Sequence, residues 1–153
     1  MRYRRPQFDI LARRLAEPRR FIQAVAGPRR VGKTALVQQV VEAVGMPVQF
    51  ASADEPTLRG ARWIAQQWEA ARLMAEASDA VLVLDEVQKI GGWSETVKRL
   101  WDEDTRKRRR IKTVLLGSAP LLIQRGLSEI LAGRFEVLYL PHWSAHKRSA
   151  PGP

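Results

Sequence analysis

The sequence predicts a three-layer α/β fold, in which a parallel sheet is covered by helices on both faces. Short apolar runs alternate along the chain with longer segments of helical periodicity, an alternation typical of βαβ units. Residues 80–84 are apolar throughout, as expected of a strand buried on both faces of a sheet. With 153 residues, of which 45% are hydrophobic, the chain has the length of one domain and enough apolar material for a core.

The first half of the chain predicts two strands and two helices. Residues 21–26 form a short apolar run that stops at a glycine, which indicates a buried strand. A helix follows and ends at Gly45 and Pro47; its apolar residues recur at helical spacing and are Leu36, Val37, Val40, Val41 and Val44. Residues 48–51 predict the second strand, and residues 57–77 predict a long helix with one apolar stripe.

The second half continues the alternation. Residues 80–84 are the third strand, and a helix follows in which Trp93, Val97, Leu100 and Trp101 share one face. Residues 113–116 and 135–140 predict the fourth and fifth strands, with a short helical stretch at 121–131 between them. Strands separated by helices in this way are expected to pair in parallel.

The composition excludes several kinds of site and location. Without cysteine the chain has no disulfide scaffold, thiolate zinc site or thiol nucleophile. Its two histidines, His142 and His146, both lie in the last dozen residues, which leaves little material for a histidine triad or metal site. No apolar run is long enough to span a bilayer, and Arg2, Arg4 and Arg5 interrupt any apolar signal core. We therefore expect a cytoplasmic protein that does not bind membranes.

A glycine-rich loop stands between the first strand and the first helix. Residues 27–34 read Gly-Pro-Arg-Arg-Val-Gly-Lys-Thr and fit the phosphate-loop (P-loop) pattern G-x-x-x-x-G-K-[ST]. Such a loop points backbone N–H groups inward at a helix N-terminus, where the helix dipole favours an anion. Lys33 would reach the β and γ phosphates, and the Thr34 hydroxyl would ligate Mg²⁺. The residues expected to hold the nucleotide are Gly27, Pro28, Arg29, Arg30, Val31, Gly32, Lys33, Thr34 and Ala35.

An acidic pair follows the third strand. Asp85 comes directly after four apolar residues and so is expected at the carboxyl end of a buried strand, where ligands collect in open α/β sheets. Asp85 would hold Mg²⁺ through its water shell, and Glu86 would orient and deprotonate an attacking water. Two solvated acids at the end of a strand are the alternative interpretation.

ATP is the nucleotide that the sequence favours. The chain contains no asparagine, so the Asn-Lys-x-Asp signature for guanine is absent. It also lacks the G-x-G-x-x-G pattern of dinucleotide-binding folds.

Four motifs in this order resemble the prokaryotic AAA-type ATPases of the AAA_14 group, whose members often carry a C-terminal DUF4143 domain. They are the phosphate loop, residues 84–104 (which begin Leu-Asp-Glu-Val-Gln-Lys-Ile-Gly-Gly-Trp), residues 115–119 (Leu-Leu-Gly-Ser-Ala) and residues 131–136 (Leu-Ala-Gly-Arg-Phe-Glu). The resemblance covers residues 13–144 approximately. It implies a three-layer P-loop NTPase core with a five-stranded parallel sheet of order 5-1-4-3-2.

The resemblance also implies roles for two further residues. Ser118 would be a polar sensor that contacts the γ phosphate or the water, although a serine before Ala119 and Pro120 also suits a helix N-cap. Arg134 would stabilise γ-phosphate charge, in cis or in a neighbouring subunit of a homo-oligomer, with a structural salt bridge as the alternative. The residues expected to act in catalysis are thus Lys33, Glu86, Ser118 and Arg134.

Members of the group continue into a helical lid and a further domain. Here residues 1–144 are expected to form the ATPase core, and residues 145–153 lack the apolar pattern and length of a lid. The resemblance therefore implies a chain without lid and downstream domain, in which nucleotide binding would be weak and turnover slow or absent.

The basic surplus offers a rival interpretation. The formal net charge is +10, and residues 106–112 contain six basic side chains in seven. Such a patch attracts nucleic acid by counterion release, so a nucleotide-dependent binding module that docks nucleic acid or a protein is the alternative to an ATPase. A small-molecule kinase is disfavoured, because Glu86 directly after Asp85 suits water activation. The sequence thus favours Mg-dependent ATP binding and hydrolysis.

Overall fold

The computed structural model describes residues 6–28, 32–53, 60–118 and 126–140. Five strands pair in parallel in one sheet of order β2-β3-β4-β1-β5. They are β1 (Ile22–Ala26), β2 (Val48–Ser52), β3 (Ala80–Asp85), β4 (Ile111–Gly117) and β5 (Phe135–Tyr139). The order is the expected 5-1-4-3-2 counted from the other edge, so the predicted P-loop NTPase architecture is confirmed.

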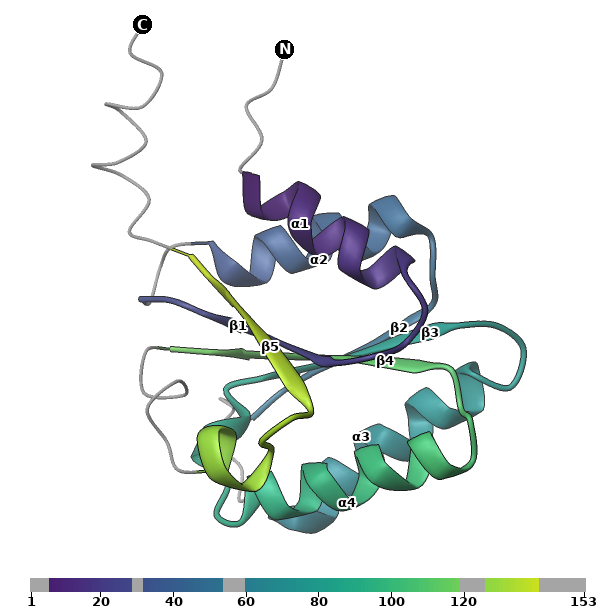
Figure 1. Cartoon of the computed structure of the whole chain (residues 1–153), viewed down its shortest axis with the longest axis vertical. Helices are drawn as coiled ribbons and strands as arrows, with labels where there is room; N and C mark the ends of the chain where they lie inside the picture. The colour runs from purple at the N-terminus through teal and green to yellow at the C-terminus, as the bar shows by residue number, and fades with distance from the viewer. Residues whose placement is uncertain (1–5, 29–31, 54–59, 119–125, 141–153) are drawn as a thin grey trace, which may run out of the picture.

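Helices cover both faces of the sheet, as Figure 1 shows. On one face lie α1 (Pro6–Ala16) and α2 (Lys33–Val44); on the other lie α3 (Ala61–Met74) and α4 (Trp93–Arg106). Alternate strand residues feed the two cores: Val81 and Val83 pack with α1 and α2, whereas Leu82 and Leu84 pack with α3 and α4. This alternation explains why the third strand is apolar along its whole length.

The observed boundaries differ from the predicted ones mainly where charged residues belong to a strand. β4 begins two residues before the predicted 113, because Lys112 lies within the strand and its side chain is buried. Its Nζ donates to the carbonyl of Leu15 at 2.6 Å and lies 3.3 Å from an oxygen of Asp79. The predicted helix at 57–77 is described over Ala61–Met74, and the stretch at 121–131 is described as one π-helical turn, η2 (Gly126–Ile130).

The helix α1 is an element that the sequence pattern does not predict. Phe8, Leu11 and Leu15 form its buried stripe and pack in the same core cluster as the apolar residues of α2. Arg14 fastens it to the sheet, donating to Gln23 of β1 at 3.2 Å and lying 3.4 Å from Glu136 of β5. A buried stripe of three residues in an eleven-residue segment that also carries Asp9, Arg13 and Arg14 is a weak pattern for identifying a helix.

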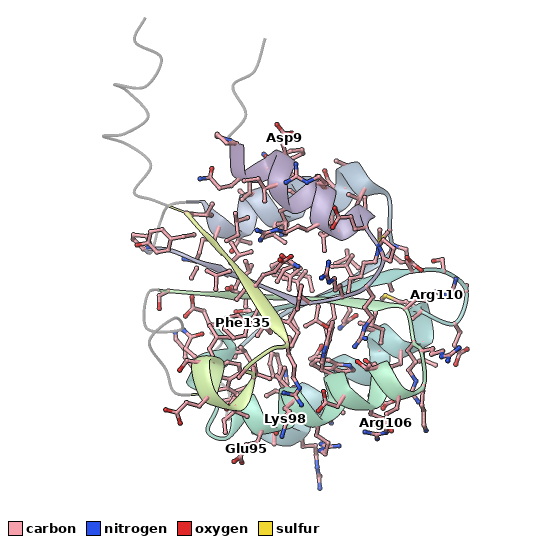
Figure 2. All side chains as sticks on the ribbon, viewed as in Figure 1. Asp9, Glu95, Lys98, Arg106, Arg110 and Phe135 are labelled. Carbon is pink, nitrogen blue, oxygen red and sulfur yellow. The ribbon has the colours of Figure 1, made fainter. Side chains whose placement is uncertain are left out.

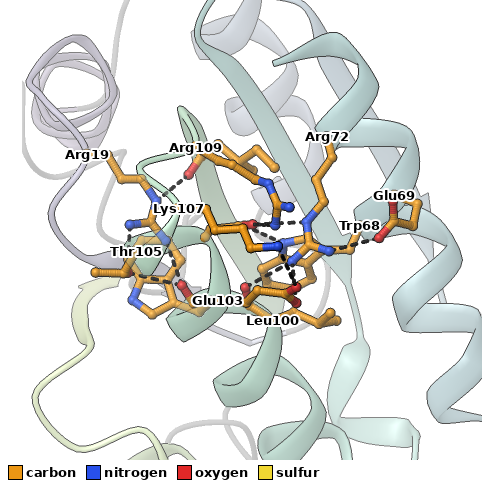
Figure 3. Close-up of polar contacts among 12 residues, drawn as sticks. Arg19, Trp68, Glu69, Arg72, Leu100, Glu103, Thr105, Lys107 and Arg109 are labelled. Carbon is orange, nitrogen blue, oxygen red and sulfur yellow. Dashed lines mark hydrogen bonds and ion pairs between the residues drawn. The ribbon is translucent and has the colours of Figure 1, made fainter. Parts of the chain in front are cut away.

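A buried carboxylate joins α3 to α4, and Figure 3 shows Trp68, Arg72 and Arg109, the three side chains that donate to it. Asp104 is fully buried and accepts hydrogen bonds from Trp68 Nε1 at 2.7 Å and Arg72 Nε at 2.9 Å. Arg109 Nη1 donates to the same carboxylate at 3.1 Å. Because these donors come from α3 and from the segment after α4, Asp104 fixes the end of α4 against α3.

Candidate functional site

The site predicted from sequence lies where strands β1, β3 and β4 end. In parallel α/β sheets, ligands bind outside the carboxyl ends of the strands, where the strand order changes direction. In this sheet β1 lies between β4 and β5, so the chain turns to opposite sides after β1 and after β4. The residues that follow these strands therefore lie where a ligand is expected to bind.

Gly27 directly follows β1, at a position where a side chain would force neighbouring backbone to shift. Its N–H donates to the carbonyl of Gly117 at 3.3 Å, which brings together the exits of β1 and β4. A Cβ atom at Gly27 would lie 2.5 Å from the carbonyl oxygen of Leu140, a backbone atom held in place by a hydrogen bond from Leu140 N–H to Ala26. The loop after β1 therefore starts from a tightly fixed point.

Gly32 turns the chain into α2. Its φ is 83° and its ψ is 28°, a left-handed conformation that favours glycine. No side chain caps α2 at Gly32, and the first hydrogen bond of the helix runs from Leu36 N–H to the Gly32 carbonyl at 2.9 Å. The first-turn amides of Lys33, Thr34 and Ala35 therefore have no partner inside the helix and lie at its positive end.

The side chain of Lys33 folds back over the loop. Lys33 is only 8% exposed, and its Nζ donates to the carbonyls of Gly27 at 3.3 Å and Pro28 at 3.2 Å. The ammonium thus lies at the exit of β1, on the same side as the first-turn amides. Thr34 and Ala35 are exposed, so the Thr34 hydroxyl is accessible from solvent.

Asp85 is the last residue of β3, two strands from β1. It lies in register with Leu116 of β4 and Ser52 of β2, and its carbonyl accepts a hydrogen bond from Ala53 N–H at 2.9 Å. Since neighbouring strands are about 4.8 Å apart, the backbones of Asp85 and Gly27 are separated by roughly 10 Å. That span suits a metal bound to the phosphates of a nucleotide in the loop.

Glu86 adopts an uncommon backbone conformation. Its φ is 57° and its ψ is 34°, in the left-handed region that costs a non-glycine residue roughly 1 kcal/mol or more. A hydrogen bond from its N–H to the carbonyl of Leu116, 2.8 Å long, holds the residue against the end of β4. Glu86 then starts η1, a 3-10 turn (Val87–Lys89), and its carboxylate accepts a hydrogen bond from Gln88.

Ser118 follows β4 directly and is half-buried. Since β4 lies between β1 and β3, Ser118 leaves the sheet between Gly27 and the acidic pair. The structure thus brings the main chain of Gly27, Asp85, Glu86 and Ser118 together at the carboxyl ends of the strands. The helix that Ser118 would cap falls within residues 119–125, which lie outside the described residues.

Arg134 lies at the other end of the strands, where β1 and β5 begin. It precedes β5, and its carbonyl accepts a hydrogen bond from Ile22 N–H at the start of β1. Gly27 lies five positions after Ile22, which is about 16 Å along a strand. Within one chain, therefore, Arg134 lies far from Gly27, where the predicted phosphate loop begins, and the structural salt bridge left open by the sequence is present.

The partner of Arg134 is Asp102 on α4. Arg134 donates from Nε to Oδ1 at 2.8 Å and from Nη2 to Oδ2 at 2.9 Å, a bidentate pair. Hydrogen bonds from Arg134 lower the pKa of Asp102, with the positive charge of Arg134 acting in the same direction. The pair ties the segment before β5 to α4.

Three of the predicted loop residues, Arg29, Arg30 and Val31, lie outside the described residues, as does the predicted tail at 145–153. Among the residues that the structure does describe, no helix combines the length and apolar character needed to cross a membrane.

The basic cluster at 106–112 lies at the amino ends of the strands, away from the predicted phosphate loop. Figure 2 shows Arg106 and Arg110 at that end of the molecule. Four of the cluster's six cations lie within 4 Å of a carboxylate: Lys107 pairs with Glu103, Arg109 with Asp104, and Arg110 and Lys112 with Asp79. Internal pairing reduces the charge available to a polyanion, and nucleic-acid binding by this face stays a prediction.

Sequence reasoning missed Gln88, whose Nε2 donates to Oε1 of Glu86 at 2.7 Å. Residues two apart do not face each other in an ordinary helix, and on a strand they share one face about two residue rises apart. The contact depends on the left-handed backbone at Glu86, for which the sequence carries no signal.

The family model AAA_14, described as an AAA domain, matches residues 19–147. No curated protein matches the chain.

Proposed function

The chain belongs to the AAA_14 family of AAA domains, and from this premise we propose that it binds Mg-ATP and hydrolyses the bond between the β and γ phosphates. Family membership indicates a nucleotide-binding, ATPase-like domain. The metal dependence, the hydrolysis and the roles of individual residues are the proposal. It is supported by the geometry at the carboxyl ends of β1, β3 and β4.

Phosphate binding is assigned to the loop between β1 and α2. Gly27, where an added Cβ atom would meet the Leu140 carbonyl, and the left-handed Gly32 are the two glycines that such a loop requires at its ends. The first-turn amides of α2 lie at the positive end of a helix of 12 residues with no side-chain cap. Lys33 adds a buried ammonium whose hydrogen bonds to two loop carbonyls are weaker than bonds to phosphate oxygens.

The donor set fits Mg²⁺ bound together with the nucleotide. Thr34 offers a hydroxyl from the first turn of α2, and Asp85 offers a carboxylate at the end of β3. Oxygen ligands of this kind, few in number and supplemented by phosphates, are what Mg²⁺ prefers in proteins. When bound, Mg²⁺ neutralises charge on the phosphate oxygens.

Glu86 is assigned the role of general base. Water would attack the γ phosphorus, the bond to the oxygen bridging the β and γ phosphates would break, and Glu86 would take the proton released by the water. The products are ADP and inorganic phosphate. Ser118, which leaves the sheet between the loop and Glu86, would contact the water or the γ phosphate.

Arg134 is assigned to a neighbouring copy of the chain. Arg134 lies where β1 begins, whereas the phosphate loop starts after β1 ends. Its guanidinium would therefore reach γ-phosphate charge only from an adjacent subunit. A homo-oligomer in which Arg134 exchanges Asp102 for phosphate would satisfy this role.

One observation carries the proposal: Gly27 and Glu86 are hydrogen-bonded through their N–H groups to Gly117 and Leu116, consecutive residues of the same strand. The test is phosphate release from Mg-ATP by the wild type and by Glu86→Gln. The wild type is expected to turn over, and the variant is expected to bind ATP with turnover reduced at least ~100-fold. A variant that hydrolyses ATP at the wild-type rate would remove Glu86 from the mechanism.

A further inference from the structure

The contact between Gln88 and Glu86 has only one chemically consistent orientation. Gln88 Nε2 lies 2.7 Å from Oε1 of Glu86. A carboxylate at neutral pH only accepts hydrogen bonds, so the amide must present its NH₂ group, because its oxygen would repel the carboxylate. The hydrogen bond occupies one carboxylate oxygen of Glu86.

The other end of the Gln88 amide is buried without a partner. Among the described residues, Gln88 Oε1 is one of two buried side-chain polar atoms that lack a hydrogen-bond partner. A buried amide oxygen without a partner destabilises the folded state, and an apolar side chain of the same length would avoid that loss. The amide therefore contributes one hydrogen bond, to Glu86, and carries one buried oxygen whose cost to stability calls for an explanation.

The backbone around this contact is constrained in a way that brings the two side chains together. Glu86 is held in the left-handed region by its hydrogen bond to Leu116, and its carbonyl accepts from Lys89 N–H at 3.1 Å to close the 3-10 turn. Val87, between the two residues, is fully buried and anchors the turn in the core. Glu86 is thus fixed at both ends, by β4 at its N–H and by Gln88 at its carboxylate.

We propose that Gln88 is a positioning residue for ATP hydrolysis, which holds Oε1 of Glu86 so that Oε2 accepts the proton of the attacking water. This inference rests on the proposed function, because it acts through the general base Glu86. A glutamate side chain has three rotatable bonds, and a hydrogen bond to one of its carboxylate oxygens restricts the orientation of the other. A base held in one orientation gains effective concentration toward the water.

The test is Gln88→Met, which keeps the length of the side chain and removes both polar atoms of the amide. We expect kcat to fall at least ~10-fold with the affinity for Mg-ATP unchanged, while Tm stays the same or rises. The matched control is Gln39→Met, the same substitution at an exposed position on α2. It should leave kcat, the affinity for Mg-ATP and Tm unchanged. A purely structural residue would instead lower Tm together with kcat.

A double-mutant cycle shows whether Gln88 acts through Glu86. In the Glu86→Gln background, Gln88→Met should cause no further loss of turnover, because the group it positions is gone. The role of Gln88 is overturned by an active wild type whose Gln88→Met variant keeps its kcat, by a joint fall of Tm and kcat, or by independent losses in the double variant. A wild type without ATPase activity overturns the proposed hydrolysis, and the role of Gln88 with it.

Discussion

Lys33 Nζ donates a hydrogen bond of 3.3 Å to the carbonyl of Gly27, the residue at which β1 ends. The lysine comes from the first turn of α2, so this contact joins the two ends of the predicted phosphate loop. It places a buried cation at the point where the chain leaves the sheet beside β4. We propose that this cation and the neighbouring amides bind the phosphates of ATP.

The close approach at Gly27 makes the first prediction. In Gly27→Ala the new Cβ would lie 2.5 Å from the carbonyl oxygen of Leu140, so either the loop or the end of β5 must shift. Overpacking of this kind costs about 1–3 kcal/mol of unfolding free energy, measured by urea denaturation. Gly91→Ala is the control, because nothing lies within 4 Å of the Cβ that this substitution adds. Equal stability of the two variants would contradict the close approach.

Asp104 carries the second prediction, on stability alone. Asp104→Asn removes a carboxylate that is fully buried and leaves Arg72 and Arg109 without their shared charge partner. Breaking a buried pair costs about 3–5 kcal/mol, so the urea midpoint should fall strongly. Glu69→Gln removes the exposed partner of Arg72 and should cost less than about 1 kcal/mol. The opposite ranking would show that Asp104 does not hold α4 against α3.

The third prediction concerns the pH dependence of the stability that Asp102 contributes. Hydrogen bonds from Arg134, and its positive charge, lower the pKa of Asp102 in the folded state. A carboxylate with a depressed folded pKa adds stability that is present above its unfolded pKa, about 3.9, and is lost as the pH falls through the folded value. Asp102→Asn should therefore lower Tm at pH 7, and the difference from the wild type should shrink below about pH 4. A difference that persists or grows in acid would contradict this origin of the stability.

Mixing two inactive variants tests the assignment of Arg134 to a neighbouring subunit. Lys33→Ala has a disabled loop but an intact Arg134, and Arg134→Ala has an intact loop without the arginine. If Arg134 acts in trans, the mixture should recover ATPase activity that neither variant shows alone. Asp102→Asn controls for loss of the ion pair, because it keeps Arg134 while removing its partner. A mixture that stays inactive would leave Arg134 with its structural role at α4.

The sequence predicted those parts of the fold whose signals are local. The buried strand at 80–84 and the amphipathic stripe from Trp93 to Trp101 fall in the observed β3 and α4, because both depend on the spacing of apolar residues. Gly27 and Gly32 could be selected because a phosphate loop needs glycine at fixed spacing. The strand order came from the family resemblance, since periodicity contains no information about which strands pair.

Contacts between distant or irregular segments could not be predicted in this way. The bidentate pair of Arg134 with Asp102 joins residues 32 positions apart and depends on how α4 packs near the start of β5. The contact of Gln88 with Glu86 depends on one left-handed residue. Lys112 illustrates a third case, because its charge argued against a strand although a backbone carbonyl and Asp79 satisfy its ammonium.

ATP binding by the loop between β1 and α2 is tested most directly by the Tm of the chain with Mg-ATP, with Mg-GTP and without nucleotide. Lys33→Ala is measured beside the wild type. A ligand that binds only the folded state stabilises it by about 2.7 kcal/mol at 100 times its Kd. We expect Mg-ATP to raise the Tm of the wild type by several degrees and Mg-GTP to raise it by less. In Lys33→Ala, Mg-ATP should leave the Tm unchanged. An unchanged Tm at millimolar Mg-ATP, or an equal rise in the variant, would contradict the assignment of this loop to ATP.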